Sequence, residues 1–356
     1  VRTVMRIGGA GERMVRYACV TTETYRHFGR VGLGAVFGSK NLKAFVVIGK
    51  GSYRAKNMKM YREVYSRIYD LAVKSDAMKK YHLIGTPVNI KPLNEIGALP
   101  TRNLQSSRFE NAEEISGEAI AEHNLGRRIA CSHCPVACIH VFTLRIPYEN
   151  EPYFYKTVMI SYDYEPIYAL GSMLGIGNRE DLLRLLHRVE IYGLDAMSTG
   201  VCLAWATEAM EKGLIGESET LLPLRFGDAN TYIKAVDHIV KQPNDFYRAL
   251  AQGVDKASEI YGGKEFALSF GGNEMPGYHA GYATHIGYLI GLRHSHLDNA
   301  GYSLDQKMKE IPEPEQMVDK LVSEEKWRQV LSSLVICFFA RNIYKPDIVV
   351  DAFKAL

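Results

Sequence analysis

Three cysteines within eight residues constrain this chain more than any other feature of its sequence. The segment CSHCPVAC holds Cys131, Cys134 and Cys138 in a C-x2-C-x3-C array. Thiolates spaced this closely can converge on one inorganic centre, and soft sulfur ligands select iron–sulfur clusters or zinc. Either centre usually takes four protein ligands, so a fourth residue must come from elsewhere. The fold must therefore bring a distant side chain to this segment.

The best candidate for the fourth ligand is Cys337, because it follows the apolar run in LVICFF. Cys202 is its competitor, although Cys202 and Cys19 also fit the description of small buried hydrophobic residues. If the centre is zinc, His133 or His140 could complete the ligand set. The spacing favours a cluster and leaves zinc open.

Composition narrows the class of protein. Six cysteines in 356 residues do not form the dense framework of a disulfide-rich secreted domain, and they suit a reducing compartment. A net charge of +3 excludes the strongly basic face of a nucleic-acid binder. No run reaches the roughly 18 to 20 apolar residues that cross a bilayer, and no signal-peptide core is visible. We therefore expect a cytoplasmic protein with no membrane span. The chain opens on Val1, without an initiator methionine, which we interpret as the start of a fragment.

Hydrophobic periodicity predicts a mainly α-helical fold with a small β-containing remnant at the N-terminus. The glycine-dense turn from Gly29 to Ala44 runs into the strand-like stretch Phe45 to Ile48. Apolar residues then recur at helical spacing in residues 61–72, 182–189, 201–214, 232–260 and 315–339. We expect three domains at residues 1–50, 51–262 and 263–356, with the last two multihelical.

Five short segments form an ordered series along the chain. They are IGGAGE (Ile7–Glu12), GRVGLGAVFGSKNLKA (Gly29–Ala44), CSHCPVAC (Cys131–Cys138), YEPIYALG (Tyr164–Gly171) and GLDAMSTG (Gly193–Gly200). In this order they resemble the signatures of the aldehyde:ferredoxin oxidoreductase family. The resemblance implies a tungsten or molybdenum ion held by two pterin cofactors beside a [4Fe–4S] cluster. It also implies that residues 1–50 end a β-rich pterin-binding domain.

The resemblance assigns roles to the cysteines and to two arginines. It places the cluster ligands at Cys131, Cys134, Cys138 and Cys337, and the pterin contacts at Arg26, Gly29 and Arg30. Glycine lets backbone N–H groups approach an anion, and arginine offers a forked donor to phosphate. The alternative is a plain glycine-rich loop with solvated arginines.

The family carries two pterin motifs, one before the helix that opens near Ala196 and one before Cys337. In the first, Asp195 matches the residue that accepts hydrogen bonds from a pterin; the alternative is an N-cap for that helix. In the second, Ser332 stands where the family has aspartate, and Val335 stands where it has glycine. The departure concerns how one pterin is held.

The substrate pocket draws on Glu165 and His296. Glu165 matches a family glutamate near the metal with a proposed role in proton transfer; the alternative is a helix-start carboxylate just before Pro166. His294 and His296 are two residues apart, so they point to opposite faces if extended, which argues against one shared metal. We choose His296 as the hydrogen-bond or proton donor.

Three functions follow from these residues. The first is oxidation of an aldehyde to a carboxylate, with electrons passing through the cluster to ferredoxin or an iron–sulfur subunit. The second is aryl-CoA reduction, because GLRHSHLDNAGYSLDQ (Gly291–Gln306) is more similar to the branch with the tungsten subunit of benzoyl-CoA reductase. The third is an iron–sulfur electron-transfer subunit without the metal–pterin. The oligomeric state stays open, with a homodimer as one option.

Overall fold

A computed structural model describes the chain except for residues 1, 24, 52–53, 149 and 309–311. The N-terminal segment forms a four-stranded antiparallel sheet in the order β3-β2-β1-β4. Its strands are β1 (Arg2–Ile7), β2 (Val20–Thr22), β3 (His27–Phe28) and β4 (Ala44–Ile48). The β-containing N-terminus is therefore confirmed.

The predicted glycine-dense turn is wrong in part, because a helix occupies its middle. Helix α2 (Leu33–Ser39) packs on α1 (Gly9–Glu12). A Cβ atom on Gly38 would lie 1.9 Å from the carbonyl oxygen of Gly11, and one on Gly34 would lie 2.5 Å from that of Cys19. These glycines let helix α2 lie close to the backbone of neighbouring segments. Residues 33–39 are therefore helical where the sequence predicted a turn.

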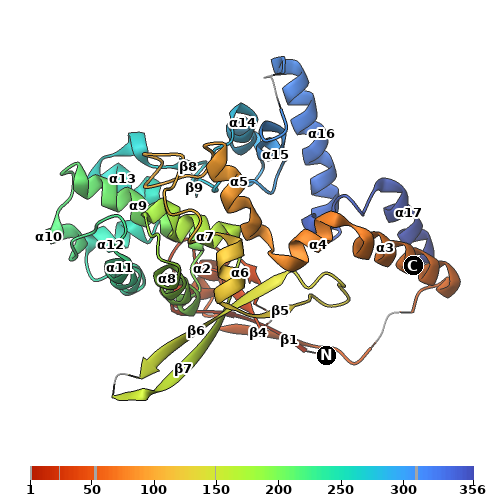
Figure 1. The fold of residues 1–356 in the computed structure, drawn as a ribbon, viewed down its shortest axis with the longest axis horizontal. Helices are drawn as coiled ribbons and strands as arrows, with labels where there is room; N and C mark the ends of the chain where they lie inside the picture. The colour runs from red at the N-terminus through yellow and green to blue at the C-terminus, as the bar shows by residue number, and fades with distance from the viewer. Residues whose placement is uncertain (1, 24, 52–53, 149, 309–311) are drawn as a thin grey trace.

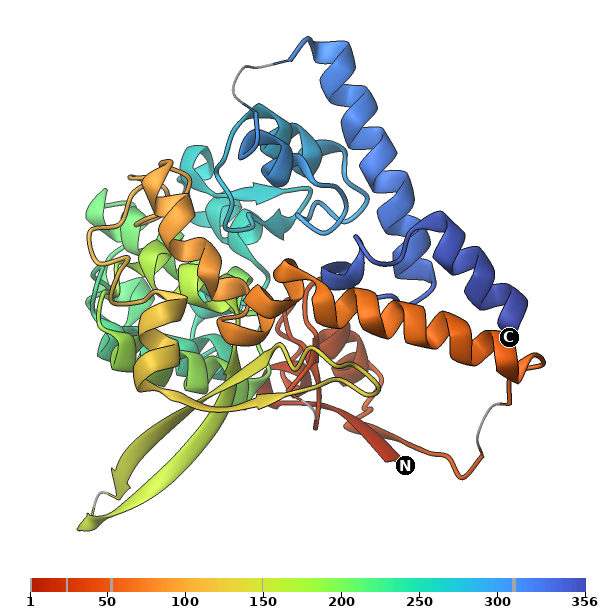
Figure 2. The ribbon, with the colours of Figure 1, turned by 45° about the vertical axis from the view of Figure 1, so that its right-hand side comes forward.

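A second sheet was not predicted and positions much of the site. Strands β5 (Leu125–Ile129), β6 (Ile139–Tyr148) and β7 (Glu151–Tyr162) pair antiparallel in that order. Their long hairpin β6–β7 extends away from the body of the molecule (Figures 1 and 2). β6 begins directly after Cys138 and β7 ends just before Asp163. One sheet therefore connects the cysteine segment to the Glu165 segment.

A helical core occupies the middle of the chain, as the periodicity predicted. Helix α9 (Ala196–Glu211) is buried at every position from Ala196 to Ala209, so the rest of the fold surrounds it on all sides. Helix α8 ends at Gly193, whose φ of 68° is the left-handed geometry of a helix C-terminus. The helices around α9 are α7 (Tyr164–Leu170), α8 (Arg179–Tyr192), α11 (Ala229–Lys241), α12 (Asp245–Leu250) and α13 (Val254–Tyr261).

The remaining helices flank this core. α3 (Met58–Lys74) lies beside α17 (Pro346–Ala355), so the C-terminus returns to the start of α3 (Figures 1 and 2). α16 (Pro314–Ser333) ends six residues before the predicted limit, because Val335 adopts a φ of 57°. The other elements are α4 (Asp76–Leu83), α5 (Ile90–Glu95), α6 (Gly117–His123), α10 (Glu217–Thr220), the hairpin β8 (Ser269–Phe270) to β9 (Asn273–Glu274), α14 (Tyr282–Ile290) and α15 (Gly301–Asp305).

The fold class is thus mainly α, as expected. Within the described residues, no helix combines the length and apolar character that a membrane span requires.

Candidate functional site

A cavity of about 320 Å³ gathers side chains from both ends of the chain, and we call it the central cavity. Five of the predicted site residues line it: Gly29, Arg30, Glu165, Asp195 and His296. They come from the N-terminal sheet region, the starts of α7 and α9, and the loop after α14. The fold therefore brings the predicted pterin and substrate residues to one place, except for Arg26, which does not line the cavity.

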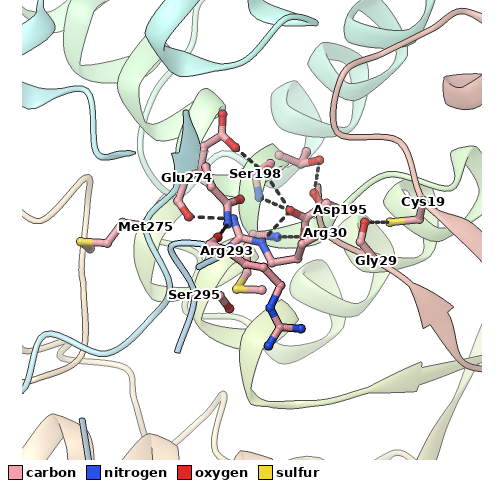
Figure 3. Close-up of polar contacts among 12 residues, drawn as sticks. Cys19, Gly29, Arg30, Asp195, Ser198, Glu274, Met275, Arg293 and Ser295 are labelled. Carbon is pink, nitrogen blue, oxygen red and sulfur yellow. Dashed lines mark hydrogen bonds and ion pairs between the residues drawn. The ribbon is translucent and has the colours of Figure 1, made fainter. Parts of the chain in front are cut away.

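Arg30 and Asp195 form a buried ion pair in one wall of the central cavity (Figure 3). Arg30 Nε lies 3.1 Å from Asp195 Oδ2, and Nη2 donates to the backbone oxygen of Glu274 at 2.7 Å. Burial lowers the pKa of Arg30, but Asp195, Tyr168 and Glu274 together outweigh it, so the net shift is upward. The third nitrogen, Nη1, is buried and has no hydrogen-bond partner among the described residues. This donor fits an oxygen of a bound pterin or phosphate group.

Asp195 also caps α9, which was the alternative role. Its carboxylate accepts from the backbone N–H groups of Met197 (3.1 Å) and Ser198 (3.4 Å). Ser198 Oγ lies 2.7 Å from Asp195 and 2.6 Å from Glu274, so its single proton can serve only one carboxylate at a time (Figure 3). Asp195 thus has a structural role, and its pterin contact stays a prediction.

Glu165 and His296 meet inside the central cavity. His296 Nε2 lies 3.2 Å from Glu165 Oε1, and the Tyr278 hydroxyl lies 3.4 Å from the same oxygen. Burial raises the pKa of Glu165, but the hydrogen bond and charge of His296 outweigh it and hold that pKa below its usual value. The His296 side chain is 6% exposed, and its Nδ1 has no partner among the described residues. The pair can therefore hold and exchange a proton next to Arg30.

His294 lies elsewhere, as the two-residue spacing predicted. It lines a separate cavity with Arg16 and Arg293, and its Nδ1 lies 2.8 Å from the backbone oxygen of Tyr288. Glu165 occupies the first turn of α7, directly before Pro166, so its helix-start role is realised together with its place in the cavity.

The cysteines gather around Arg26. Its Nη2 lies 3.9 Å from Cys138 Sγ, and Cys131 and Cys337 are within electrostatic reach of the same guanidinium. Burial lowers the pKa of Arg26. Asp163 and these thiols together raise it by more, so the net shift is upward. Cys134 shares the neighbour Tyr344 with Cys337. In the described part of the chain, no three His, Cys, Asp or Glu side chains converge as metal ligands.

The competing ligands are engaged in other contacts. Cys202 is fully buried inside α9 beside Tyr17 and Glu274. Both ring nitrogens of His140 face backbone oxygens, Nδ1 that of Cys138 and Nε2 that of His82. Cys337, in contrast, follows α16 and reaches the CSHCPVAC segment across the fold.

Two basic–acidic pairs at this site were not predicted from the sequence. His27 Nε2 lies 2.7 Å from Glu190, and both line the central cavity. Burial lowers the pKa of His27, but Glu190 outweighs it and the net shift is upward. The available signal in the sequence was an acidic residue three positions before Gly193.

The second missed pair joins Asp163 to Arg26. Asp163 Oδ2 lies 3.4 Å from Arg26 Nη1, and Oδ1 accepts from the Thr86 hydroxyl at 3.1 Å. Burial raises the pKa of Asp163 to about 6, although Arg26 opposes the shift. Arg26 therefore lies between this carboxyl group, which lines the central cavity, and the cysteine group.

Two family models match this chain. The family model described as "Aldehyde ferredoxin oxidoreductase, domains 2 & 3" matches residues 63–356, and the model of the N-terminal domain matches residues 2–49. The tungsten-containing aldehyde ferredoxin oxidoreductase of Thermococcus kodakarensis is 35% identical over 77% of this chain and 44% of that protein. The Pyrococcus abyssi protein of the same name is 36% identical over the same shares.

Two further relatives extend the comparison. A Pyrococcus furiosus protein named as the WOR-like subunit of an aliphatic sulfonate oxidoreductase is 30% identical over 72% of this chain and 40% of that protein. The solved BamBC active-site complex of benzoyl coenzyme A reductase, with 1,5-dienoyl-CoA, shares the fold with a TM-score of 0.78. That match has 19% identity and covers 99% of this chain and 61% of the other.

This chain spans less than half the length of the curated relatives that it matches. The two family models together nevertheless account for nearly every residue. The chain therefore belongs to the aldehyde ferredoxin oxidoreductase family.

Proposed function

We propose that the protein is a tungsten–pterin oxidoreductase that oxidises an aldehyde to a carboxylate and passes the electrons through a [4Fe–4S] cluster to a ferredoxin. One observation carries the proposal: the Glu165–His296 pair shares the central cavity with Arg30, and Arg26 joins that cavity to the cysteine group. The names of the relatives support tungsten over molybdenum.

The residues present fit the two cofactors. Four cysteine thiols are the ligand set of a [4Fe–4S] cluster, and Cys131, Cys138 and Cys337 lie around Arg26. The buried Nη1 of Arg30 is a free donor for a pterin or phosphate oxygen. When bound, the metal–pterin group would take up two electrons from the substrate and the cluster would carry them onward singly.

The chain's own residues would manage water and protons. Oxidation of an aldehyde and one water to a carboxylate releases two electrons and three protons. Glu165, held as a carboxylate by His296, would accept a proton from the hydroxyl of the water or hydrate. The Tyr278 hydroxyl, 3.4 Å from Glu165, would fix the orientation of that carboxylate.

A second candidate is aryl-CoA reduction with the electrons flowing the other way. The fold shared with the BamBC complex over 99% of the chain favours it. The third candidate is an electron-transfer subunit without the metal–pterin. This function gives no role to Arg30 and the Glu165–His296 pair in the central cavity.

Elemental analysis and EPR of the anaerobically purified, dithionite-reduced protein test the proposal. We expect about four iron atoms per chain with tungsten and a reduced-cluster signal. Cys337→Ser should lower the iron content and alter the signal, and the matched variant Cys202→Ser should not. Iron without tungsten or molybdenum would favour the electron-transfer subunit, and zinc without iron would exclude the redox function. Aldehyde and aryl-CoA assays of the metal-loaded protein then separate the two enzymatic candidates.

A further inference from the structure

The lining of the central cavity contains two arginines beyond the basic groups that face its carboxylates. Each of its four carboxylates already faces a basic side chain. The pairs are Asp163 with Arg26 at 3.4 Å, Glu165 with His296 at 3.2 Å, Glu190 with His27 at 2.7 Å and Asp195 with Arg30 at 3.1 Å. Two further arginines, Arg328 and Arg341, also line the cavity, and neither pairs with a carboxylate of its lining in the described part of the chain.

Arg328 is the more deeply buried of the two, at 2% exposure on α16. Nη1 donates to the backbone oxygen of His296 at 3.3 Å, and Nε lies 3.5 Å from Glu324, whose side chain is 39% exposed. The guanidinium also lies 5.6 Å from the centre of the Phe338 ring. Nη2 is buried without a partner among the described residues. A buried charged donor left unpaired is costly, so this position calls for an acceptor.

Arg341 extends the same side of the cavity. Its Nη1 donates to the backbone oxygen of Phe338 at 2.8 Å, and it also hydrogen-bonds Tyr81, another lining residue. The two guanidinium groups thus come from one C-terminal segment that runs past Cys337. Arg328 places positive charge beside His296, and Arg341 adds a second positive charge beside the backbone oxygen of Phe338.

We propose that this side binds an oxyanion carried by the substrate itself, so that the substrate class is small aldehydes with a carboxylate or sulfonate group. Arg328 supplies the main contact and Arg341 the second. The aldehyde carbon of the substrate then faces Glu165 and His296, because Arg328 is hydrogen-bonded to the backbone oxygen of His296. The inference rests on the proposed aldehyde oxidation and specifies the substrate of that site.

Paired substrates test the inference on the metal-loaded full chain. 4-Oxobutanoate and butanal have the same carbon chain and differ in the terminal carboxylate. We expect a higher kcat/KM for 4-oxobutanoate, and Arg328→Gln should lower the ratio of the two values by about 10- to 100-fold, as for one charge-assisted hydrogen bond. Arg328→Lys should restore part of the ratio. Lys326→Gln, an equal charge change at an exposed position of the same helix, should leave it unchanged. Sulfoacetaldehyde against propanal distinguishes sulfonate from carboxylate.

Two measurements do not depend on turnover. Calorimetric binding of succinate should weaken in Arg328→Gln, and the tungsten and pterin content should stay at the level of the unchanged protein. An unchanged substrate ratio in Arg328→Gln would overturn the inference. A loss of pterin without a change in the ratio would also overturn it and would assign Arg328 to the cofactor. If no aldehyde is oxidised, the proposed function fails, and succinate binding alone then decides whether Arg328 forms an oxyanion site.

Discussion

At the scale of single residues, the contact between His296 and Glu165 controls a protonation state. Burial would raise the pKa of Glu165, and His296 reverses that shift. Glu165 is therefore a carboxylate across the neutral range, as a proton acceptor must be.

Removing the histidine should expose the effect of burial. In His296→Gln the pKa of Glu165 should rise. Glu165 is then protonated at a higher pH than in the unchanged protein, and activity that needs the carboxylate is lost there. The acid limb of the kcat/KM profile should therefore move to higher pH. His294→Gln, in the separate cavity, is the control and should leave the limb in place. An unmoved limb in His296→Gln would contradict the role of Glu165.

Val335 is a second residue whose effect can be measured alone. It has a φ of 57° and is 92% exposed, so a β-branched side chain occupies left-handed geometry without any compensating burial. Val335→Gly should stabilise the protein by about 1 kcal/mol, since the relief of strain exceeds the added entropy of the unfolded chain. Thermal unfolding measures the change. Val335→Ala keeps the left-handed strain and should give a smaller gain; destabilisation by glycine would refute the strain.

At the scale of elements, close contact between α7 and α9 holds the site together. α7 carries Glu165 and α9 begins at the capping residue Asp195. The helices meet at Gly200, where a Cβ atom would lie 2.2 Å from the backbone oxygen of Ala169. The two helices therefore fix the distance between the proton acceptor and the Arg30–Asp195 pair.

Gly200→Ala should destabilise the protein by about 1–3 kcal/mol, because the added methyl group forces the helices apart. Helix propensity alone predicts the opposite sign, a gain of about 1 kcal/mol. Denaturant unfolding separates the two. Gly51→Ala is the control, because a Cβ atom there would meet nothing within 4 Å among the described atoms. A stabilised Gly200→Ala variant would show that the helices yield easily.

At the scale of the whole molecule, the N-terminal sheet leaves apolar surface exposed. β4 forms one edge, and its residues Phe45 to Ile48 are each 48% to 70% exposed. An exposed apolar edge strand can pair with another chain.

The chain studied alone should therefore associate as its concentration rises. Val47→Lys should weaken this association by placing a charge on the edge strand, and sedimentation velocity can follow it. Val318→Lys makes the same change at an exposed valine of α16 and should have little effect. Equal association of both variants would show that β4 is not the contact.

The sequence by itself determined the family, the helical class and most helix positions. These are local properties, because periodicity, short motifs and the spacing of Cys131, Cys134 and Cys138 depend only on residues close together in the sequence. The same reading missed the β5-β6-β7 sheet and the helix inside the Gly29–Ala44 segment. In both places pairing or close backbone contact with distant segments overrode the local pattern.

Only the tertiary structure decided which side chains share the central cavity. It separated His296 from His294, joined Glu190 to His27, and carried Arg328 from α16 to the backbone of His296. Contacts between residues so far apart in the chain depend on how sheets and helices pack. Packing is set by the shapes of many side chains together, which no short stretch of sequence contains.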